Sequence, residues 1–423
     1  MKLTDSYKKR LNVLIPFYRN QKFEETRNDI WRQVHFYTDV KTNTLICSTR
    51  TYCSLENQKD TVKDEIYEFS ADKLNKKLEE RINWNQIIMN STKKLIDVMN
   101  CKQDEKSIII INELLTQLCN TKDVLYYDEV CDLLKALKLF LTDREFVSEK
   151  EFYKFDKISD IYKDELYDLL MYYLYVYANF HEDEKITYVL NKYSYSQSKL
   201  ISNQRFAVYE FIRNQNYTHA HNLFQKLLSE LDDERFEIQK LYIYMDMLSI
   251  LVRYDNSDSI KRYCDFIECL LETLSLTNHQ KYIFYSNLAT KCILIEEYEK
   301  CLDYLKKAYA FNKEYTIRML ICVCFSYSIM GRKIPEEYLS CNDKTKGDKI
   351  EWRLYTYFKN YDKQTEKAGI DYLLKEVLPS LKYNDDLYFK ILEKIIFDFC
   401  EENNAYKPLF VFNKMKKNAK NSK

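Results

Sequence analysis

Residues 282–313 read YIFYSNLATKCILIEEYEKCLDYLKKAYAFNK, and this stretch decides the fold. Small and large apolar side chains recur there every three or four residues, which places them on one face of each of two consecutive helices. The residues that carry this pattern are Leu288, Ala289, Tyr298, Cys301, Leu305 and Ala308. The small residues let the two helices approach closely, and the large ones fill the space beside them. The stretch predicts a helical hairpin whose apolar face needs neighbours.

A second stretch, residues 202–232, repeats the pattern of the second helix. Its matching residues are Tyr217, Ala220, Phe224 and Leu227. Tyr217 and Tyr298 are 81 residues apart (298 − 217), which leaves room for two units of about forty residues. The region between them keeps the apolar period, with helices predicted over residues 239–253 and 258–274. The sequence therefore predicts an array of helical hairpins.

Both hairpins resemble the tetratricopeptide repeat, a helix–turn–helix unit of about 34 residues with small, large and aromatic residues at these positions. The resemblance implies an α-solenoid, a curved stack in which the first helix of each unit lines a concave groove.

The composition favours an all-α fold and argues against enzymes. The chain has 423 residues, too many for one core, but only 3 Gly and 4 Pro, so tight turns and helix breaks are few. Gly331, Gly347 and Gly369 stand alone, which excludes a phosphate-binding glycine loop. No nucleophile is paired with a histidine and a carboxylate. We expect a protein that is not an enzyme and has no cofactor.

The cysteines and histidines give no metal-binding pattern. The 13 cysteines are scattered, without two spaced CxxC motifs, and predict free thiols in a reducing compartment, the cytoplasm. His219 and His221 point away from each other on a helix, so no metal site is expected. Residues 1–10 lack the apolar segment of a signal peptide, and no apolar run reaches the 18 or so residues of a membrane span. We expect no membrane partner.

Two domains are expected: residues 1–80, and residues 81–423, which form the repeat array. In the second, the apolar period predicts helices over 82–99, 108–118, 124–141, 148–157, 160–180, 185–200, 315–330, 348–359, 365–378, 386–402 and 406–415. Residues 331–347 make the clearest break.

The first domain is basic. Residues 1–59 hold 11 Lys or Arg against 6 Asp or Glu, giving +5, and the remainder holds 54 against 59, giving −5. Helices are predicted over residues 5–19, where Pro16 should kink or end the helix, and over residues 24–37. The stretch ICSTRTYCSLENQK, residues 46–59, predicts a short helix that buries Tyr52 and Leu55 and has Ser48 as N-cap.

The exposed side of this short helix carries Ser, Thr and Arg, a composition suited to the major groove of DNA, where arginine can contact guanine through two hydrogen bonds. The alternative is an ordinary surface helix. The run resembles the recognition helix of Xre-like helix-turn-helix domains. This resemblance implies that base edges are contacted by Ser48, Thr49, Arg50 and Ser54. It implies that phosphates are contacted by Asn57 and Lys59. Downstream, Ile66, Phe69 and Leu74 match apolar positions of the closing helices.

Two departures from the Xre-like pattern stand out. Gln58 occupies the position where glycine is preferred, so the left-handed turn there should be strained or reshaped. Lys41 and Thr42 occupy positions where the preceding helix should have an apolar residue and alanine.

Polar residues on the first helices of the two hairpins are candidates for peptide binding. These are Arg205, Tyr209 and Arg213 in the earlier hairpin, and Asn287 and Thr290 in the later one. An amide such as that of Asn287 can pair with the N–H and C=O of an extended peptide, and arginine can hold a carboxylate. The alternative is that each is simply a solvated polar residue.

A helix-turn-helix followed by tetratricopeptide-like repeats is similar to the Rgg, PlcR and PrgX group of bacterial peptide-pheromone regulators. The similarity implies a cytoplasmic homodimer that binds double-stranded DNA and a short signalling peptide. Peptide binding would alter the spacing of the two DNA-reading helices. The alternative from another class is a tetratricopeptide adaptor that binds proteins and not DNA, with residues 1–80 as a cap.

Overall fold

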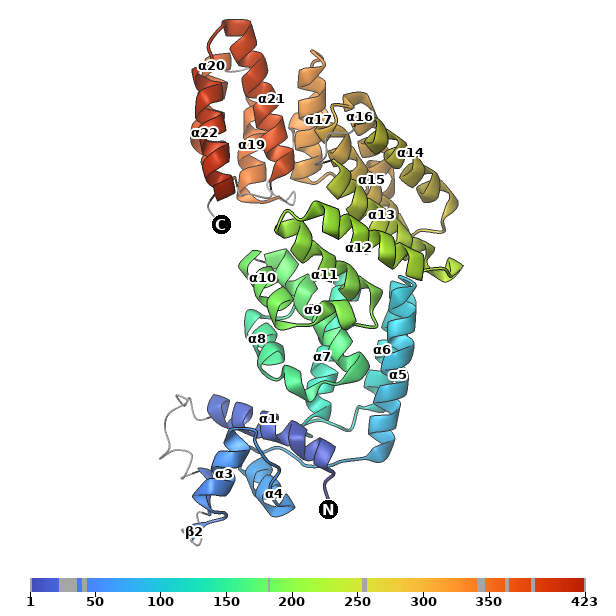
Figure 1. Cartoon of the computed structure of the whole chain (residues 1–423), viewed down its shortest axis with the longest axis vertical. Coiled ribbons are helices and arrows are strands. Elements are labelled where there is room, and N and C mark those ends of the chain that lie inside the picture. The colour runs from blue at the N-terminus through green and yellow to red at the C-terminus, as the bar shows by residue number, and fades with distance from the viewer. Residues whose placement is uncertain are drawn as a thin grey trace. The chain divides into compact units, whose positions relative to one another are not determined.

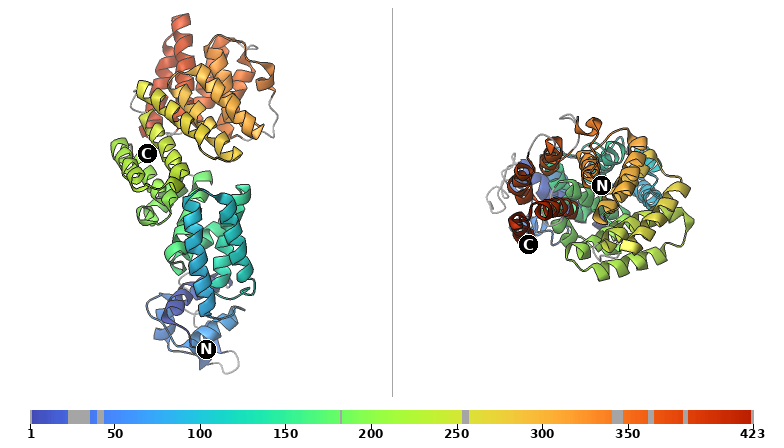
Figure 2. Two further views of the ribbon diagram at one scale, coloured as in Figure 1. Left: turned by 90° about the vertical axis from the view of Figure 1, so that its right-hand side faces the viewer. Right: turned by 90° about the horizontal axis from the view of Figure 1, so that it is seen from above.

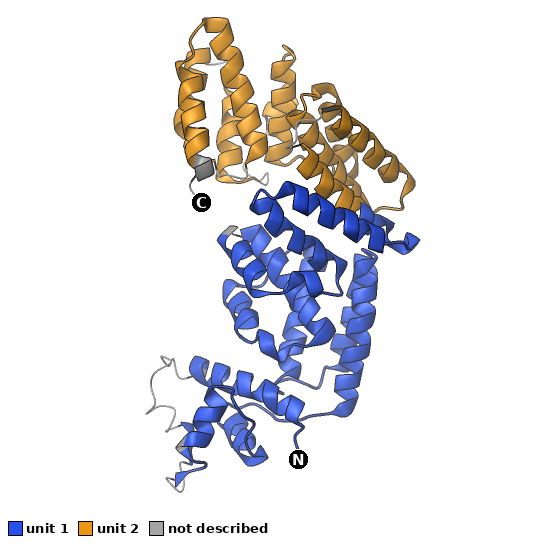
Figure 3. Cartoon of the chain, viewed as in Figure 1, with its two compact units in different colours: residues 1–240 blue, residues 241–423 orange. Residues whose placement is uncertain are grey.

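The computed structural model describes residues 2–22, 36–39, 44–181, 183–252, 257–340, 347–361, 365–381 and 385–421. These parts are almost entirely helical, which confirms the all-α prediction (Figure 1). The chain forms two compact units, unit 1 of residues 1–240 and unit 2 of residues 241–423 (Figure 3). The domain boundary expected at residue 80 lies inside unit 1.

Unit 1 contains one small sheet and a series of helices. Strands β1 (Thr38–Asp39) and β2 (Thr44–Leu45) pair antiparallel, and the sequence pattern predicts no strand there. The helices are α1 (Asp5–Lys22), α3 (Thr49–Glu56), α4 (Asp64–Lys73), α5 (Ile82–Asn100), α6 (Asp104–Gln117), α7 (Tyr127–Asp143), α8 (Glu149–Lys157), α9 (Asp164–His181), α10 (Asp183–Lys192), α11 (Ile201–Arg213) and α12 (Tyr217–Glu230). Helix α13 (Glu237–Leu251) crosses the boundary between the units.

The N-terminal helix differs from its prediction. Helix α1 does not end at Pro16 but continues to Lys22. A proline inside a helix removes one backbone hydrogen bond, and burial of the surrounding face offsets that loss. Of the helix predicted over residues 24–37, residues 24–35 lie outside the described residues, and Tyr37 lies in a turn.

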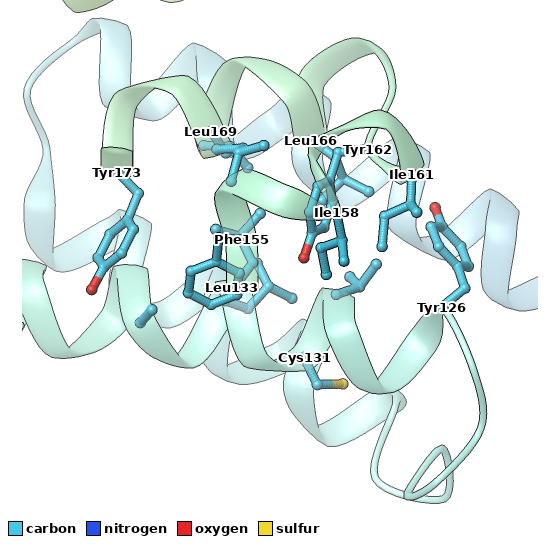
Figure 4. Packing of buried hydrophobic residues seen from close by; sticks show 14 of the residues in the cluster. Tyr126, Cys131, Leu133, Phe155, Ile158, Ile161, Tyr162, Leu166, Leu169 and Tyr173 are labelled. Carbon is cyan, nitrogen blue, oxygen red and sulfur yellow. The ribbon is translucent and has the colours of Figure 1, made fainter. Parts of the chain in front are cut away.

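The core of unit 1 lies between α7, α8 and α9. Leu133 of α7, Phe155 of α8 and Leu169 of α9 point into the same space (Figure 4). Aromatic rings fill much of the rest, as in the stacked pair of Phe152 and Tyr177, whose centroids are 4.5 Å apart. Helices α5 and α6 lie side by side along this core (Figure 2). The many tyrosines are therefore core residues with a polar end.

The described part of residues 1–80 packs onto this core through α1. The buried hydroxyl of Tyr7 donates to the carbonyl oxygen of Leu125 at 2.9 Å. The guanidinium of Arg10 lies 3.8 Å from the centre of the Tyr126 ring, a cation–π contact. These contacts join the N-terminal helices to the start of α7, which explains why the two regions form one compact unit.

Unit 2 contains α14 (Ser257–Thr273), α15 (Asn278–Leu294), α16 (Tyr298–Asn312), α17 (Ile317–Ile329), α18 (Glu336–Leu339), α19 (Lys349–Lys359), α20 (Glu366–Tyr372), α21 (Asp386–Asn403) and α22 (Lys407–Asn421). The helix predicted over residues 365–378 is α only as far as Tyr372. A π-helical turn, Leu373–Val377, and a 3₁₀ turn, Leu378–Ser380, follow it. Pro379 lies in the latter and cannot donate the hydrogen bond that an α-helix requires.

The two hairpins that suggested repeats share one backbone turn. A left-handed residue follows shortly after the first helix of each, Gln215 with φ +60° in one and Glu296 with φ +64° in the other, again 81 residues apart. In each, the next residue donates its N–H to the carbonyl five positions earlier, at 2.8 Å and 2.9 Å. This is the Schellman pattern, which satisfies carbonyl groups at a helix end.

Most of the predicted packing residues of the hairpins are buried, whereas Tyr217 and Tyr298 are half-buried. Ala220 and Phe224 are buried in the first hairpin, and Cys301, Leu305 and Ala308 in the second. The apolar period of residues 282–313 therefore marks the face that the hairpin buries against its neighbours. Every helix in the described parts of the chain is too short or too polar to cross a lipid bilayer.

Candidate functional site

Helix α3 is the centre of the candidate DNA-binding site, and its inner face is firmly held. Tyr52 and Leu55 are completely buried, and the ring of Tyr52 stacks on that of Tyr37 at 5.3 Å. The Ser48 hydroxyl accepts the backbone N–H of Thr51, which confirms Ser48 as the N-cap. The helix is therefore fixed in orientation although it has only eight residues.

The predicted DNA-contacting residues differ in their surroundings. Ser48, Arg50, Asn57 and Lys59 are exposed, and the side chains of Arg50 and Lys59 form no hydrogen bond or ion pair with other described residues. Ser54 is half-buried, and its hydroxyl donates to the Asp60 carboxylate at 3.0 Å. Ser54 is thus engaged within the chain.

Asn57 also makes a side-chain contact within the chain. The Asn57 side chain donates to the carbonyl oxygen of Cys53 at 2.7 Å, so it caps the end of α3. The side chain of Thr49, like residues 41 and 42, lies outside the described residues.

The turn after α3 keeps the left-handed geometry despite lacking glycine. Gln58 has φ +57°, and the N–H of Lys59 donates to the carbonyl oxygen of Ser54 at 2.9 Å. The turn is therefore not reshaped, and Gln58 carries the steric cost of a side chain in this region.

A buried ion pair that the sequence did not reveal holds the end of α3 to α1. The Arg19 Nε and Nη2 atoms donate to the two carboxylate oxygens of Glu56, each at 2.8 Å. The Tyr37 hydroxyl donates to the same carboxylate at 2.8 Å, and burial together with the Glu56 charge raises the pKa of Tyr37. The one available signal was Arg19 itself, which follows Leu11 and Ile15 at four-residue spacing on the apolar face of α1.

Helix α1 is also tied to α7 through a buried carboxyl group. The Tyr18 hydroxyl donates to Glu129, which also accepts the backbone N–H of Tyr126. Burial raises the pKa of the Glu129 carboxyl. Nearby, the Lys76 ammonium lies 3.0 Å from a carboxylate oxygen of Asp128. Within unit 1, α1 therefore connects α3 to α7 through charged and hydrogen-bonded groups.

The candidate peptide-binding residues of unit 1 lie one turn apart on α11. Arg205 is only 6% exposed, and its Nη2 atom donates to the Tyr209 hydroxyl at 3.4 Å. The Tyr209 ring stacks on Phe206, and Arg213 donates to the Thr187 hydroxyl at 3.0 Å. Tyr209 and Arg213 are half-buried, so a ligand has readier access to these two residues than to Arg205.

The candidate residues of unit 2 lie on α15. Asn287 is exposed, and its amide makes no hydrogen bond with other described residues. The Thr290 hydroxyl donates to the carbonyl oxygen of Asn287 at 2.7 Å, which occupies its proton. The free amide of Asn287 is therefore the better-placed group for pairing with a peptide backbone.

Metal ligands are not clustered in the described parts of the chain, where no three His, Cys, Asp or Glu side chains lie close enough to share an ion. The described cysteines are free thiols. No protein-family model matches this chain, and no curated protein is significantly similar to it.

Proposed function

We propose that this protein is a peptide-responsive transcriptional regulator that binds double-stranded DNA through α3. The observation that carries the proposal is the position of Arg50, exposed and uncommitted at the start of a capped helix whose other face is locked in place. An arginine presented this way can make two hydrogen bonds to guanine in the major groove. The resemblance of residues 48–59 to Xre-like recognition helices supports the same assignment.

Lys59 lies beyond the C-terminal end of α3 and is exposed, so its ammonium fits a contact with a phosphate. Ser48 is exposed at the N-terminal end, close in sequence to Arg50, and fits a contact with a base edge. In this arrangement Arg50 would specify sequence, while Lys59 would add affinity that does not depend on sequence.

We further propose that a short peptide binds the repeat-like helices, with the Asn287 amide pairing with its backbone. The chain would act in the cytoplasm as a homodimer, because two DNA half-sites about 34 Å apart require two recognition helices. A ligand can control such a regulator if it binds more tightly to one spacing of the two helices. The α1 contacts to Glu56 and Glu129 offer a route within unit 1 from the helical core to α3.

A selection from random DNA duplexes at low salt tests the DNA-binding part. We expect wild-type protein to enrich one sequence, and Arg50→Ala to weaken binding to it by about 1–3 kcal/mol. The control is Lys94→Ala, which removes an exposed positive charge from α5 and should change binding little. Failure to enrich any duplex, or an unchanged preference in Arg50→Ala, would reject DNA reading by α3.

Salt dependence separates the regulator from the alternative adaptor. Each phosphate contact releases bound counterions, so DNA affinity should fall steeply as salt rises. In a plot of log affinity against log salt concentration, Lys59→Ala should reduce the steepness of the slope by about one. A partner protein bound with little salt dependence, without DNA binding, would favour the adaptor.

For the peptide part, calorimetry with candidate peptides should show weaker binding by Asn287→Ala, while Asn112→Ala on α6 should behave as wild type.

A further inference from the structure

Unit 2 contains a cavity of about 450 Å³ between α17, α19, α20 and α21. Its inner wall is formed by the buried residues Tyr357, Gly369, Ile370 and Ile395. Its rim carries exposed Tyr361, Glu366 and Glu402, and half-buried Asp398 and Phe399 lie between. No lysine or arginine is among the described residues that line it. A volume of this order suits a small ligand or one or two peptide side chains.

A buried tyrosine in this wall has an unused hydrogen-bonding group. Tyr357 lines the cavity and is only 5% exposed; its hydroxyl forms no hydrogen bond with another described residue, and its oxygen is not fully enclosed. Its ring packs edge-on against Tyr361, with centroids 5.9 Å apart, and the ring of Tyr361 forms part of the rim. Tyrosine hydroxyls in a protein interior usually have a hydrogen-bond partner. Because Tyr357 lines the cavity, a ligand bound there can supply one.

The cavity is negatively charged. Asp398 is paired with Lys394 at 2.9 Å, but the carboxylates of Glu366 and Glu402 have no cationic partner in the described chain. The Asn403 amide lies 3.4 Å from Glu366, which brings the ends of α20 and α21 together and places both glutamates on one rim. Two unpaired carboxylates beside aromatic rings favour a cation, which is attracted both by the charges and by the ring faces.

We propose that this cavity binds an organic cation, a primary ammonium group carried on an apolar chain. The ammonium would lie between Glu366 and Glu402 and donate to the Tyr357 hydroxyl, while the apolar chain would contact Ile370 and Phe399. Either a lysine-containing peptide or a free diamine can supply this chemistry. The site lies wholly in unit 2 and does not depend on DNA binding by α3.

Calorimetry on the full chain with three probes tests the proposal. The probes are acetyl-Phe-Lys-amide, the same compound acetylated at Nζ, and 1,5-diaminopentane. We expect the free ammonium of the dipeptide to improve affinity about tenfold or more over the acetylated form, and the gain to shrink at high salt. Tighter binding of the dipeptide identifies a peptide source, and tighter binding of the diamine a free amine. Equal binding of the acetylated probe, or no binding by either amine, overturns the proposal.

Variants locate the binding to this cavity. The double variant Glu366→Gln, Glu402→Gln should lose about tenfold in affinity for the dipeptide, and Tyr357→Phe should lose a few-fold. The matched control is Glu401→Gln, adjacent in sequence, whose carboxylate accepts the Tyr406 hydroxyl and does not line the cavity. Circular dichroism checks that each variant is folded. Unchanged affinity in a folded double variant would place the amine elsewhere and refute the assignment.

Discussion

Arg19 donates two hydrogen bonds of 2.8 Å to the Glu56 carboxylate, and both side chains are nearly inaccessible to solvent, at 2% and 7% exposure. Because one residue lies on α1 and the other at the last position of α3, the pair fixes the helix that presents Arg50. Buried pairs of this kind make a weak net contribution to stability, but loss of one partner leaves an uncompensated charge.

The Arg19–Glu56 pair predicts a local loss of stability. Arg19→Met should lower the free energy for opening α3 by about 3 kcal/mol, because Glu56 would remain buried without its cation. Hydrogen exchange of the α3 amides measures this opening directly. The control is Lys226→Met, which removes half of an exposed pair with Glu230, at 73% and 56% exposure, and should have almost no effect. Equal protection of α3 in Arg19→Met and wild type would contradict the prediction.

The left-handed turn after α3 predicts a stabilising substitution. Gln58→Gly should raise stability by about 1 kcal/mol, since glycine adopts φ +57° without steric cost. Gln58→Ala is the comparison, because it shortens the side chain but keeps the Cβ atom, and it should give no such gain. Protection of the Lys59 amide, which closes the turn, reports the change. A destabilised glycine variant would show that the Gln58 side chain has a role not visible in its contacts.

The burial of Glu129 predicts that the stability of the fold depends on pH. Burial raises its pKa above the usual 4.5, so the unfolded chain releases this proton first as pH rises. The stability linked to the protonated form is complete below pH 4.5 and is lost as pH rises through the pKa of the folded state. Glu129→Gln keeps an oxygen acceptor for Tyr18 but cannot ionise.

The variant Glu129→Gln should therefore gain stability relative to wild type across that pH interval. Urea unfolding at a series of pH values, followed by circular dichroism, measures the difference between the two proteins. Glu113→Gln, which changes an exposed residue of α6, should track wild type throughout. A difference that narrows or reverses with rising pH would mean that nearby cations, such as Lys154, dominate over burial.

Gly347 predicts a steric cost in unit 2. A Cβ atom at this position would lie 2.6 Å from side-chain atoms of Ile317, closer than such atoms approach. Gly347→Ala should destabilise unit 2 by about 1–3 kcal/mol, as overpacking does. Gly331→Ala is the companion variant: it has open space around the added atom but φ +65°, so only backbone strain of about 1 kcal/mol applies. The urea midpoints of unfolding of the two variants measure the difference. Equal destabilisation by both would show that close packing against Ile317 adds no cost at Gly347.

Local pattern predicted most of the helices because helix formation depends on side chains three and four residues apart. The Ser48 N-cap and the burial of Tyr52 and Leu55 follow from such short-range rules. The left-handed turns at Gln215 and Glu296 were not predicted, but they repeat the spacing of 81 residues between Tyr217 and Tyr298. The same reasoning predicted that Pro16 would kink or end α1; the helix does not end there but continues to Lys22, because burial of the helix outweighs one missing hydrogen bond.

The sequence by itself determined that this chain is all-α, short of glycine loops, and built of hairpins with buried apolar faces, since composition and periodicity are properties of neighbouring residues. Only the tertiary structure decided which groups far apart in the chain meet. It paired Arg19 with Glu56, buried Glu129 next to Tyr18, and placed Tyr357 and Glu366 in the lining of one cavity. Such meetings depend on how whole helices pack, and packing is set by the sum of many weak contacts rather than by a local motif.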